Sequence, residues 1–228
     1  MKRFGRSARE QAEFEKFHYP GPDEVLRNKF ELRDRELLET FEVYFWAKRA
    51  QEGLPEAAKQ LDVEGLKAIH RHHLQDVYDW AGEFRTYTTG RGAAPFAPPE
   101  QIRPWLDQQF DNLKAEQYLR NMDAAHFAER AAHYVNEINA AHPFIEGNGR
   151  TQRVWLRNLA EQAGHHVRFG SEDRGRWYEA SRIGFEKAEI EPMASLIRDS
   201  LVRGNDHERD SGDAPEFTRD PPTQDRQR

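Results

Sequence analysis

Apolar residues recur at intervals of three or four positions through most of the chain between residues 23 and 202. This spacing places them on one face of an α-helix. The stretches with this pattern are 23–30, 34–52, 63–76, 98–113, 123–141, 151–163 and a last region from 175 to about 202. On the 34–52 stretch the inward stripe is predicted to be Leu37, Leu38, Phe41 and Phe45. The pattern therefore predicts a mainly helical protein.

Polar and glycine residues mark the ends of several of these helices. Asp62 and Asp123 stand directly before apolar-periodic stretches, where an aspartate side chain can cap the free amides of a first turn. Gly164 follows the 151–163 stretch, a position that favours the left-handed C-cap conformation. The helix from Asp123 is predicted to end just before His142.

One stretch does not follow helical spacing. Residues 84–89 read Phe-Arg-Thr-Tyr-Thr-Thr, and β-branched and aromatic residues of this kind favour a strand. The run Gly90-Arg-Gly92 offers a turn, after which residues 93–97 can return as a second short strand. The predicted fold class is therefore all-α with one small β-hairpin.

The two ends of the chain differ in composition from its middle. Residues 1–16 form a charged N-terminal extension that fits either a frayed helix or disorder, and residues 17–203 are expected to form one domain. Within residues 204–228 only Ala214 and Phe217 are apolar. This polar tail cannot bury a core and is predicted to be disordered.

Overall composition limits the classes of function. The 228-residue chain carries a formal net charge of -6, which gives no general attraction to nucleic acid or to an anionic membrane. It has no cysteine, so disulfides and thiolate metal sites are excluded. No apolar run approaches the ~18 residues of a membrane span, and no apolar segment follows the basic start. We expect a cytoplasmic protein, with a secreted effector as the alternative.

The densest chemistry lies in the run His142-Pro-Phe-Ile-Glu-Gly-Asn-Gly-Arg-Thr-Gln-Arg153, between two predicted helices. Amides at a helix start are unpaired and suit an anion, and Gly147 and Gly149 let the backbone approach a ligand closely. Arg150 and Arg153 are three positions apart and share a helical face. Each feature alone is ordinary, as a turn or a solvated face. Together they predict a phosphate-binding site.

This run resembles the signature H-P-F-x-[D/E]-G-N-G-R-x-x-R of the Fic family of nucleotidyl transferases, and it matches every defining position. Residues 19–29 and Val77-Tyr-Asp-Trp-Ala-Gly82 also resemble that family, so the similarity extends over roughly residues 17–202. The resemblance implies a Fic-type helical bundle with a β-hairpin flap. It also implies transfer of AMP from ATP to a Tyr, Thr or Ser hydroxyl of a target protein, with release of pyrophosphate.

The resemblance also implies a role for each residue of the run. His142 would be the general base, because the ordinary histidine pKa of about 6.5 lies near operating pH. Glu146 would hold Mg²⁺ together with phosphate oxygens. The residues implied to bind the phosphates of ATP are Gly147, Asn148, Gly149, Arg150 and Arg153. Phe144 would anchor the run in the core.

The predicted hairpin is implied to be the flap that aligns the target. Main-chain pairing along an exposed strand edge would present the target hydroxyl to His142. The residues expected to dock the target are Arg85, Thr86, Tyr87 and Thr88. The alternative is an ordinary hairpin that covers the core.

Fic proteins are commonly inhibited by a helix with the motif [S/T]-x-x-x-E-[G/N], whose glutamate pairs with the second arginine, here Arg153. In this chain no Ser or Thr has Glu four residues later. The hypothesis is that a separate small antitoxin supplies the glutamate, which makes this chain the toxin of a toxin–antitoxin pair. By analogy the target could be a type II topoisomerase subunit. The alternatives are a non-catalytic nucleotide-binding or adaptor module, and a transferase that uses another nucleotide or phosphate donor.

Two other groups of residues receive structural interpretations. His70, His72 and His73 lie close together, but no His-Glu-x-x-His pattern is present, and a solvated helix face is preferred over a metal site. Trp177, Tyr178 and Ser181 lie in the last helical region. Core packing is favoured at least equally over contact with the nucleotide.

Overall fold

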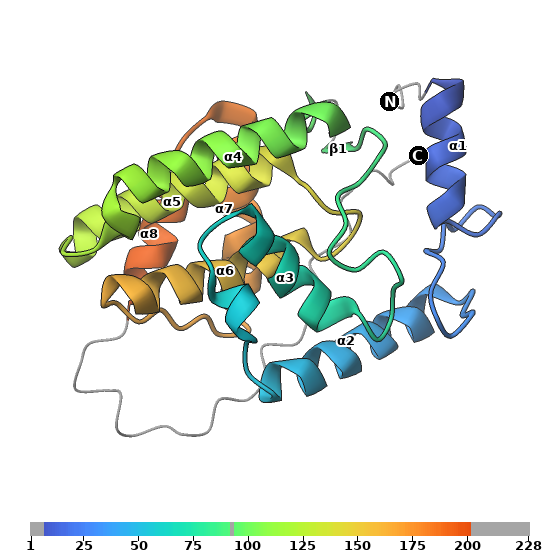
Figure 1. Ribbon diagram of the computed structural model, residues 1–228, viewed down its shortest axis with the longest axis horizontal. Helices are drawn as coiled ribbons and strands as arrows, with labels where there is room; N and C mark the ends of the chain where they lie inside the picture. The colour runs from blue at the N-terminus through green and yellow to red at the C-terminus, as the bar shows by residue number, and fades with distance from the viewer. Residues whose placement is uncertain (1–6, 92–93, 202–228) are drawn as a thin grey trace.

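The computed structural model describes residues 7–91 and 94–201 (Figure 1). This part of the chain contains α-helices, two short 3₁₀ turns and one two-stranded antiparallel sheet, which confirms the predicted fold class. The helices are α1 (Ala8–Phe17), α2 (Arg35–Gln51), α3 (Val63–Leu74), α4 (Pro99–Ala115), α5 (Ala124–Ala141), α6 (Asn148–Ala163), α7 (Asp173–Lys187) and α8 (Glu191–Ser200). The 3₁₀ turns are Glu56–Lys59 and Gln117–Leu119.

Helix α5 lies at the centre of the bundle, in contact with α4, α6, α7 and α8 (Figure 1). Its apolar stripe is buried completely at Phe127, Ala131 and Val135. Helices α4 and α6 add fully buried Leu106 and Trp155 to the same cluster. Because α5 packs against other helices on several sides, His142, which directly follows its last residue, has a fixed position.

Helix α2 packs on the other side of α3 and belongs to a second apolar cluster with the 74–81 segment. Its buried stripe is Leu38, Glu42 and Trp46, one residue per helical turn. The predicted stripe was therefore partly wrong, since Leu37 is 44% exposed. A charged residue occupies the middle of the real stripe, and hydrophobic periodicity cannot detect such a position.

The predicted helix ends at Asp62, Asp123 and Gly164 are confirmed. Two boundaries differ: α6 begins at Asn148 rather than at 151, and the last helical region is two helices, α7 and α8. These two are separated at Ala188, which has the left-handed conformation (φ 57°). The short 188–190 connection lets α8 turn back to pack against α5 and α7.

The helix predicted over 23–30 is absent, and that prediction was wrong. Glu24 and Glu31 adopt positive φ, and His18 and Leu26 form an isolated antiparallel bridge. The side chain of Asn28 donates to the carbonyls of Leu26 and Leu32, at 2.9 Å and 2.8 Å. Side-chain bonds to nearby backbone of this kind compete with a helix.

The strand predicted over 84–89 is also absent. The observed strands are β1 (Gly90–Arg91) and β2 (Ala94–Pro95), paired as Gly90 with Pro95 and Arg91 with Ala94. Residues 92–93 between them lie outside the described residues. The backbone of the 84–89 stretch instead bonds to distant groups: the Arg85 amide donates to the Pro143 carbonyl at 2.9 Å.

The N-terminal extension contains helix α1 from Ala8, with a capping box between Ser7 and Glu10. Phe14 of α1 is buried and meets Tyr87 edge-to-face, with ring centroids 5.4 Å apart. Figure 1 shows α1 standing beside the segment that precedes β1. The predicted disorder of 204–228 concerns residues outside those described. Within the described ranges no helix is both long and apolar enough to cross a bilayer.

Candidate active site

His142 is the residue at which α5 ends. Its amide donates to the Ile138 carbonyl at 3.0 Å, and its backbone is left-handed, with φ 41° and ψ 61°. For a residue other than glycine this conformation costs about 1–2 kcal/mol. The half-buried imidazole stacks on Phe96 at 3.9 Å with planes 4° apart. The surrounding fold thus holds the ring in a fixed plane.

Burial lowers the pKa of His142 to about 3, and the positive charges of Arg85 and Arg91 act in the same direction. The sequence prediction of an ordinary pKa near 6.5 therefore does not hold for the protein without nucleotide. At neutral pH the imidazole is uncharged and has a lone pair available. This is the protonation state that a general base requires.

Asn148 gives the loop between α5 and α6 its shape. Its Oδ1 accepts from the Phe144 amide at 2.9 Å, and its Nδ2 donates to the Phe144 carbonyl at 2.8 Å. Phe144 is 1% exposed, so the predicted anchoring of the loop in the core is confirmed. Because the Asn148 side chain is engaged within the loop, only its backbone amide is presented at the helix start. Its phosphate contact stays a prediction.

Gly147 makes the turn from this loop into α6. Its φ is +79°, and a Cβ at this position would lie 2.9 Å from Cδ1 of Leu74. The first helical bond runs from the Thr151 amide to the Gly147 carbonyl at 2.9 Å. The amides of Asn148 and Gly149 therefore stand at the helix start, before the first internal bond of the helix. Such a helix start favours a phosphate.

The two arginines of the signature contact different elements. Arg150 is 3% exposed, and its Nη2 donates to Oε2 of fully buried Glu42 at 2.7 Å. Its guanidinium also lies over the Trp46 ring, 4.8 Å from the centroid. Arg153 instead lies over Trp177 of α7, at 5.5 Å. Arg150 thus ties the loop to α2, and the phosphate roles of both residues stay predictions.

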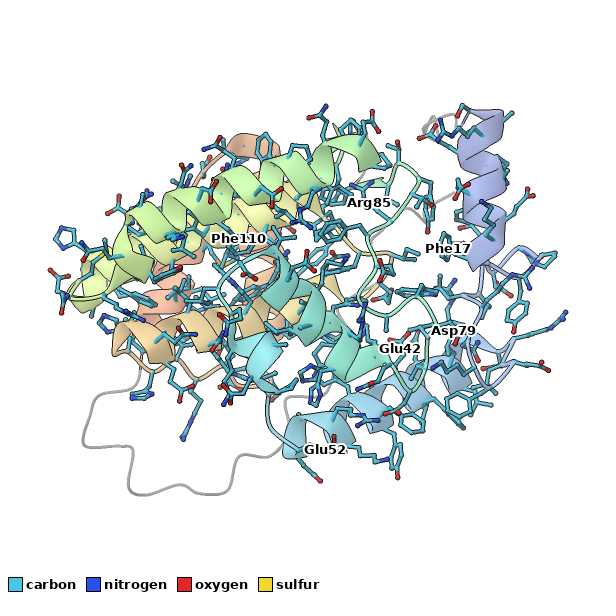
Figure 2. The ribbon with its side chains drawn as sticks, viewed as in Figure 1. Phe17, Glu42, Glu52, Asp79, Arg85 and Phe110 are labelled. Carbon is cyan, nitrogen blue, oxygen red and sulfur yellow. The ribbon has the colours of Figure 1, made fainter. Side chains whose placement is uncertain are left out.

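Glu42 completes this buried network from α2. It also accepts a hydrogen bond from the Tyr78 hydroxyl. In Figure 2 Glu42 lies on the side of α2 that faces the rest of the molecule, whereas Glu52 points away from it. Sequence analysis did not identify Glu42. The one available signal is a charged residue in register with Leu38 and Trp46.

Glu146 is the predicted magnesium ligand. Its side chain is 21% exposed, and Oε1 accepts from the Gly147 amide at 2.9 Å. The same oxygen lies 3.6 Å from Nη2 of Arg150. The described residues hold no group of three or more His, Asp or Glu placed to bind a metal. A single, partly exposed carboxylate fits Mg²⁺, which usually takes one or two carboxylates and completes its shell with water and phosphate.

Arg85, one of the predicted docking residues, has an almost completely buried side chain. Its Nε donates to the His142 carbonyl at 2.8 Å, and Nη1 donates to the Tyr87 carbonyl at 2.9 Å. Nη2 donates to the carbonyls of Ala97 and Ala141. The side chain thus fastens the end of α5 to both sides of the small sheet.

The other three predicted docking residues lie next to α1. Glu13 accepts from the Thr86 hydroxyl at 2.9 Å. Glu10 accepts from the Thr88 amide at 3.2 Å and from its hydroxyl at 2.5 Å. The hydrogen bond from the Thr88 side chain is the main reason that the pKa of Glu10 falls to about 2. Tyr87 is buried, at 2% exposure.

Arg91 is a further charged residue near His142 that sequence analysis missed. Its guanidinium lies 5.8 Å from the Phe96 ring centroid and 5.1 Å from that of Tyr178. Since Phe96 stacks on His142, Arg91 connects β1 and α7 beside the predicted base. A single arginine between two glycines gives no signal of this position. Trp177 and Ser181 are both buried, which agrees with core packing.

The predicted solvated face on α3 was wrong. His70 and His73 are 0% and 2% exposed, and desolvation lowers their pKa values to about 3 and about 4. His73 stacks on Trp46 at 4.2 Å and bonds through Nδ1 to the Ile69 carbonyl at 3.0 Å. Only His72 is partly exposed. Neutral histidines of this kind can pack in a core when each ring nitrogen or ring face finds a partner.

Comparison with known proteins agrees with this geometry. The profile of the Fic/DOC family matches residues 60–160. A probable protein adenylyltransferase, y4lH of Sinorhizobium fredii, is 39% identical over 181 residues, which are 79% of this chain and 92% of the relative. The chain belongs to the Fic/DOC family. The family membership implied by the 142–153 signature is thereby confirmed.

Two more relatives of this Fic/DOC chain extend the comparison. Protein adenylyltransferase VbhT of Bartonella schoenbuchensis is 36% identical over 181 residues, covering 78% of this chain and 37% of VbhT. The crystal structure of the BepC effector protein of Bartonella tribocorum with bound AMPPNP has a TM-score of 0.74. The two chains are 26% identical, and the match covers 82% of this chain and 97% of the chain in that crystal structure.

Proposed function

We propose that this Fic/DOC chain transfers AMP from ATP to a Tyr, Thr or Ser hydroxyl of a target protein and releases pyrophosphate. Relatives with more than a third of their aligned residues identical are named protein adenylyltransferases, and BepC binds an ATP analogue. The observation that carries the proposal is that a neutral His142 and the N-terminus of α6 lie at the two ends of one short loop. The proposed base and the proposed phosphate site would then lie close together, with His142 before the loop and the first residues of α6 after it.

In the proposed reaction the target hydroxyl oxygen bonds to the α-phosphorus while the bond from that phosphorus to pyrophosphate breaks. The hydroxyl proton passes to His142. The amides at the α6 N-terminus stabilise the charge that develops on the phosphate oxygens. Negative phosphates beside His142 raise its pKa from the low value of the empty protein, which strengthens it as a base. Mg²⁺ held at Glu146 would neutralise phosphate charge.

Docking of the target is proposed to use the main chain of 86–88, beside His142. In this proposal the side chain of Arg85 holds the loop and does not bind the target. The amide of Thr88 is bonded to Glu10. A target strand that pairs with the Thr88 amide would therefore have to displace the Glu10 carboxylate. A type II topoisomerase subunit is kept as a candidate target by analogy.

Control of the site is proposed to come from a separate antitoxin. The [S/T]-x-x-x-E-[G/N] motif is missing from the sequence, and Arg153 is the residue against which such a glutamate would act. The chain would then be the toxin of a toxin–antitoxin pair acting in the cytoplasm. The test is to co-express this chain with candidate small proteins encoded beside it and to purify any complex. A partner that inhibits AMP transfer, and that no longer does so when one of its glutamates is substituted, supports the proposal.

Two forms of labelled ATP test the reaction itself. The purified protein is incubated with a cell lysate and ATP labelled either on the α- or on the γ-phosphate. Label attached to protein from α-labelled ATP alone, and absent with His142→Ala, is the expected result. Protein label from γ-labelled ATP would point to phosphotransfer. No protein label from either form, with ATP binding intact, would favour a non-catalytic nucleotide-binding module.

A further inference from the structure

His70 of α3 joins three parts of the molecule that converge behind the His142 loop, here residues 142–147. Its Nε2 lies 3.0 Å from the carbonyl oxygen of Glu146. Its Nδ1 accepts from the Gly82 amide at 2.8 Å. Its ring stacks on Phe144 with centroids 3.9 Å apart and planes 17° apart. Both ring nitrogens and one ring face are therefore engaged, in a side chain with 0% exposure.

The two hydrogen bonds fix the tautomer of this imidazole. The Gly82 amide can only donate, so Nδ1 must be the nitrogen with the lone pair. Nε2 then carries the hydrogen and donates it to the Glu146 carbonyl. A histidine can satisfy both partners at once because a neutral ring offers one donor and one acceptor on opposite sides. Phenylalanine would keep the ring but leave both backbone groups without a partner.

The bond to Glu146 acts on the peptide that leads into the anion site. The carbonyl of Glu146 belongs to the same peptide unit as the Gly147 amide, which bonds to the Glu146 carboxylate at 2.9 Å. Fixing this peptide sets both the carboxylate and the left-handed turn at Gly147. The turn in turn sets the direction in which the first amides of α6 point.

The second bond reaches the segment that carries Arg85. Gly82 has φ +86°, and a Cβ there would lie 2.9 Å from Arg71 Cβ, so this turn is tightly packed on α3. Three residues later Arg85 donates to the His142 carbonyl. The imidazole of His70 thus holds the 142–147 loop near its end, and the Gly82–Arg85 segment that it supports holds the start.

We propose that His70 is a positioning residue for the nucleotide site, fixing the 146–147 peptide so that Glu146 and the α6 amides meet ATP phosphates in the right geometry. This rests on the proposed function of the loop. Residues that orient site groups from behind typically change affinity or activity 10–100-fold when replaced. His70 is not proposed to touch ATP or to exchange a proton with it.

The chain offers a matched control on the same helix. His73 is also buried and also stacks on an aromatic ring, but its nitrogen bonds to its own helix and not to the loop. His70→Phe and His73→Phe therefore remove the same chemical group from the same core. His70→Gln retains an amide that can donate to the Glu146 carbonyl and accept from Gly82.

Two measurements on these variants separate the outcomes. Amide hydrogen exchange without nucleotide is expected to be at least ~10-fold faster at 144–149 in His70→Phe than in His73→Phe. The dissociation constant for MgATP, measured by calorimetry, is expected to rise ~10-fold in His70→Phe, to change less than ~2-fold in His73→Phe, and to be partly restored in His70→Gln. Comparing the variants with each other removes general effects of lost stability.

Equal exchange at 144–149 in the two phenylalanine variants would overturn the positioning role. Faster exchange with unchanged MgATP affinity would also overturn it, because the loop would then be loosened without consequence for the site. Failure of the proposed function looks different. In that case the unaltered protein does not bind MgATP, or binds it and transfers no AMP, while the exchange difference between the variants persists.

Discussion

The His142 loop and the 84–91 segment lie side by side, but they are held in different ways. The loop closes on itself: the Asn148 side chain bridges both backbone groups of Phe144, and Gly147 turns the chain into α6. The 84–91 segment has only the two residues of β1 in a sheet. Other backbone groups of the segment bond to the Arg85 side chain, to Glu10 of α1, and to the backbone of Pro143 and Phe96. The loop is shaped largely by its own residues, with further support from Arg85 and His70, whereas the 84–91 segment depends mainly on distant partners.

This difference decides what the sequence can reveal. A loop that is shaped largely by its own residues carries much of its structure in a short run of residue types, so the run at 142–153 was sufficient to identify the family and the loop. A segment held by residues far along the chain shows only its own propensity. The β-branched run at 84–89 favours a strand by itself, yet Arg85 and Glu10 take the bonds that a strand would need.

Removing the Arg85 side chain should have the largest effect. Arg85→Met leaves buried carbonyls at both the loop and the small sheet without their donor, and several unsatisfied groups of this kind should together cost about 3–5 kcal/mol of unfolding free energy. Urea unfolding measures the loss. Arg103→Met is the control, because Arg103 forms exposed pairs with Glu64 and Asp107 and should cost under about 1 kcal/mol. Similar losses in both variants would show that Arg85 does not hold the segment.

A smaller loss is expected where the loop closes on itself. Asn148→Ala leaves the buried amide and carbonyl of Phe144 without partners, at a cost of about 2–4 kcal/mol. Asn158→Ala, in the same helix, removes a bond to the Lys59 carbonyl and a bond from the Gln162 side chain. Because Gln162 also donates to that carbonyl, no backbone group loses its partner, and the change should cost about 1 kcal/mol. Thermal unfolding of the two variants compares them. Equal losses would mean that the loop is held mainly from outside, as the 84–91 segment is.

Acid should destabilise the protein through its buried histidines. Burial lowers the pKa values of His70 and His142 to about 3 and of His73 to about 4. Below pH 6.5 the unfolded chain therefore binds protons that the folded chain does not. Stability is full above pH 6.5 and falls as the pH drops toward 4, by about 1.4 kcal/mol per pH unit for each such histidine.

The exposed histidine His126 changes stability with pH in the opposite direction. Asp123 raises the pKa of exposed His126, so its contribution grows as the pH falls below the folded value. Urea unfolding at pH 7, 6 and 5 gives the net slope. In His73→Phe the slope of unfolding free energy against pH should decrease by about 1.4 kcal/mol per pH unit, the contribution of one proton. An unchanged slope in that variant would mean that His73 is not a buried neutral group.

The smallest effect is expected at the contact between α1 and the 84–91 segment. Glu10→Gln weakens the bonds that lower the pKa of Glu10 to about 2, but the site is near the surface, so global stability should change little. Hydrogen exchange at the Thr88 amide should accelerate severalfold, while exchange at 144–149 stays the same. Faster exchange at both places would show that the contact with α1 also supports the His142 loop.

Much of the fold followed from the sequence, for physical reasons that individual residues illustrate. Asp62, Asp123 and Gly164 act within one helical turn, so their roles could be predicted. Buried polar residues could not, because Glu42 and His70 owe their burial to partners 108 and 76 positions away. The same limit applied to the site: the signature residues were recognised as a set, whereas the burial of Arg85 and His70 behind them was not predicted.

The most direct test of the account compares binding and chemistry in His142→Ala. MgATP affinity by calorimetry and AMP transfer from α-labelled ATP are measured on the same preparations. Because the α6 amides bind the phosphates and His142 acts on the proton, affinity should stay within about 3-fold while transfer falls at least about 100-fold. Transfer that persists in His142→Ala, or affinity lost together with transfer, would contradict the assignment of His142 as the base.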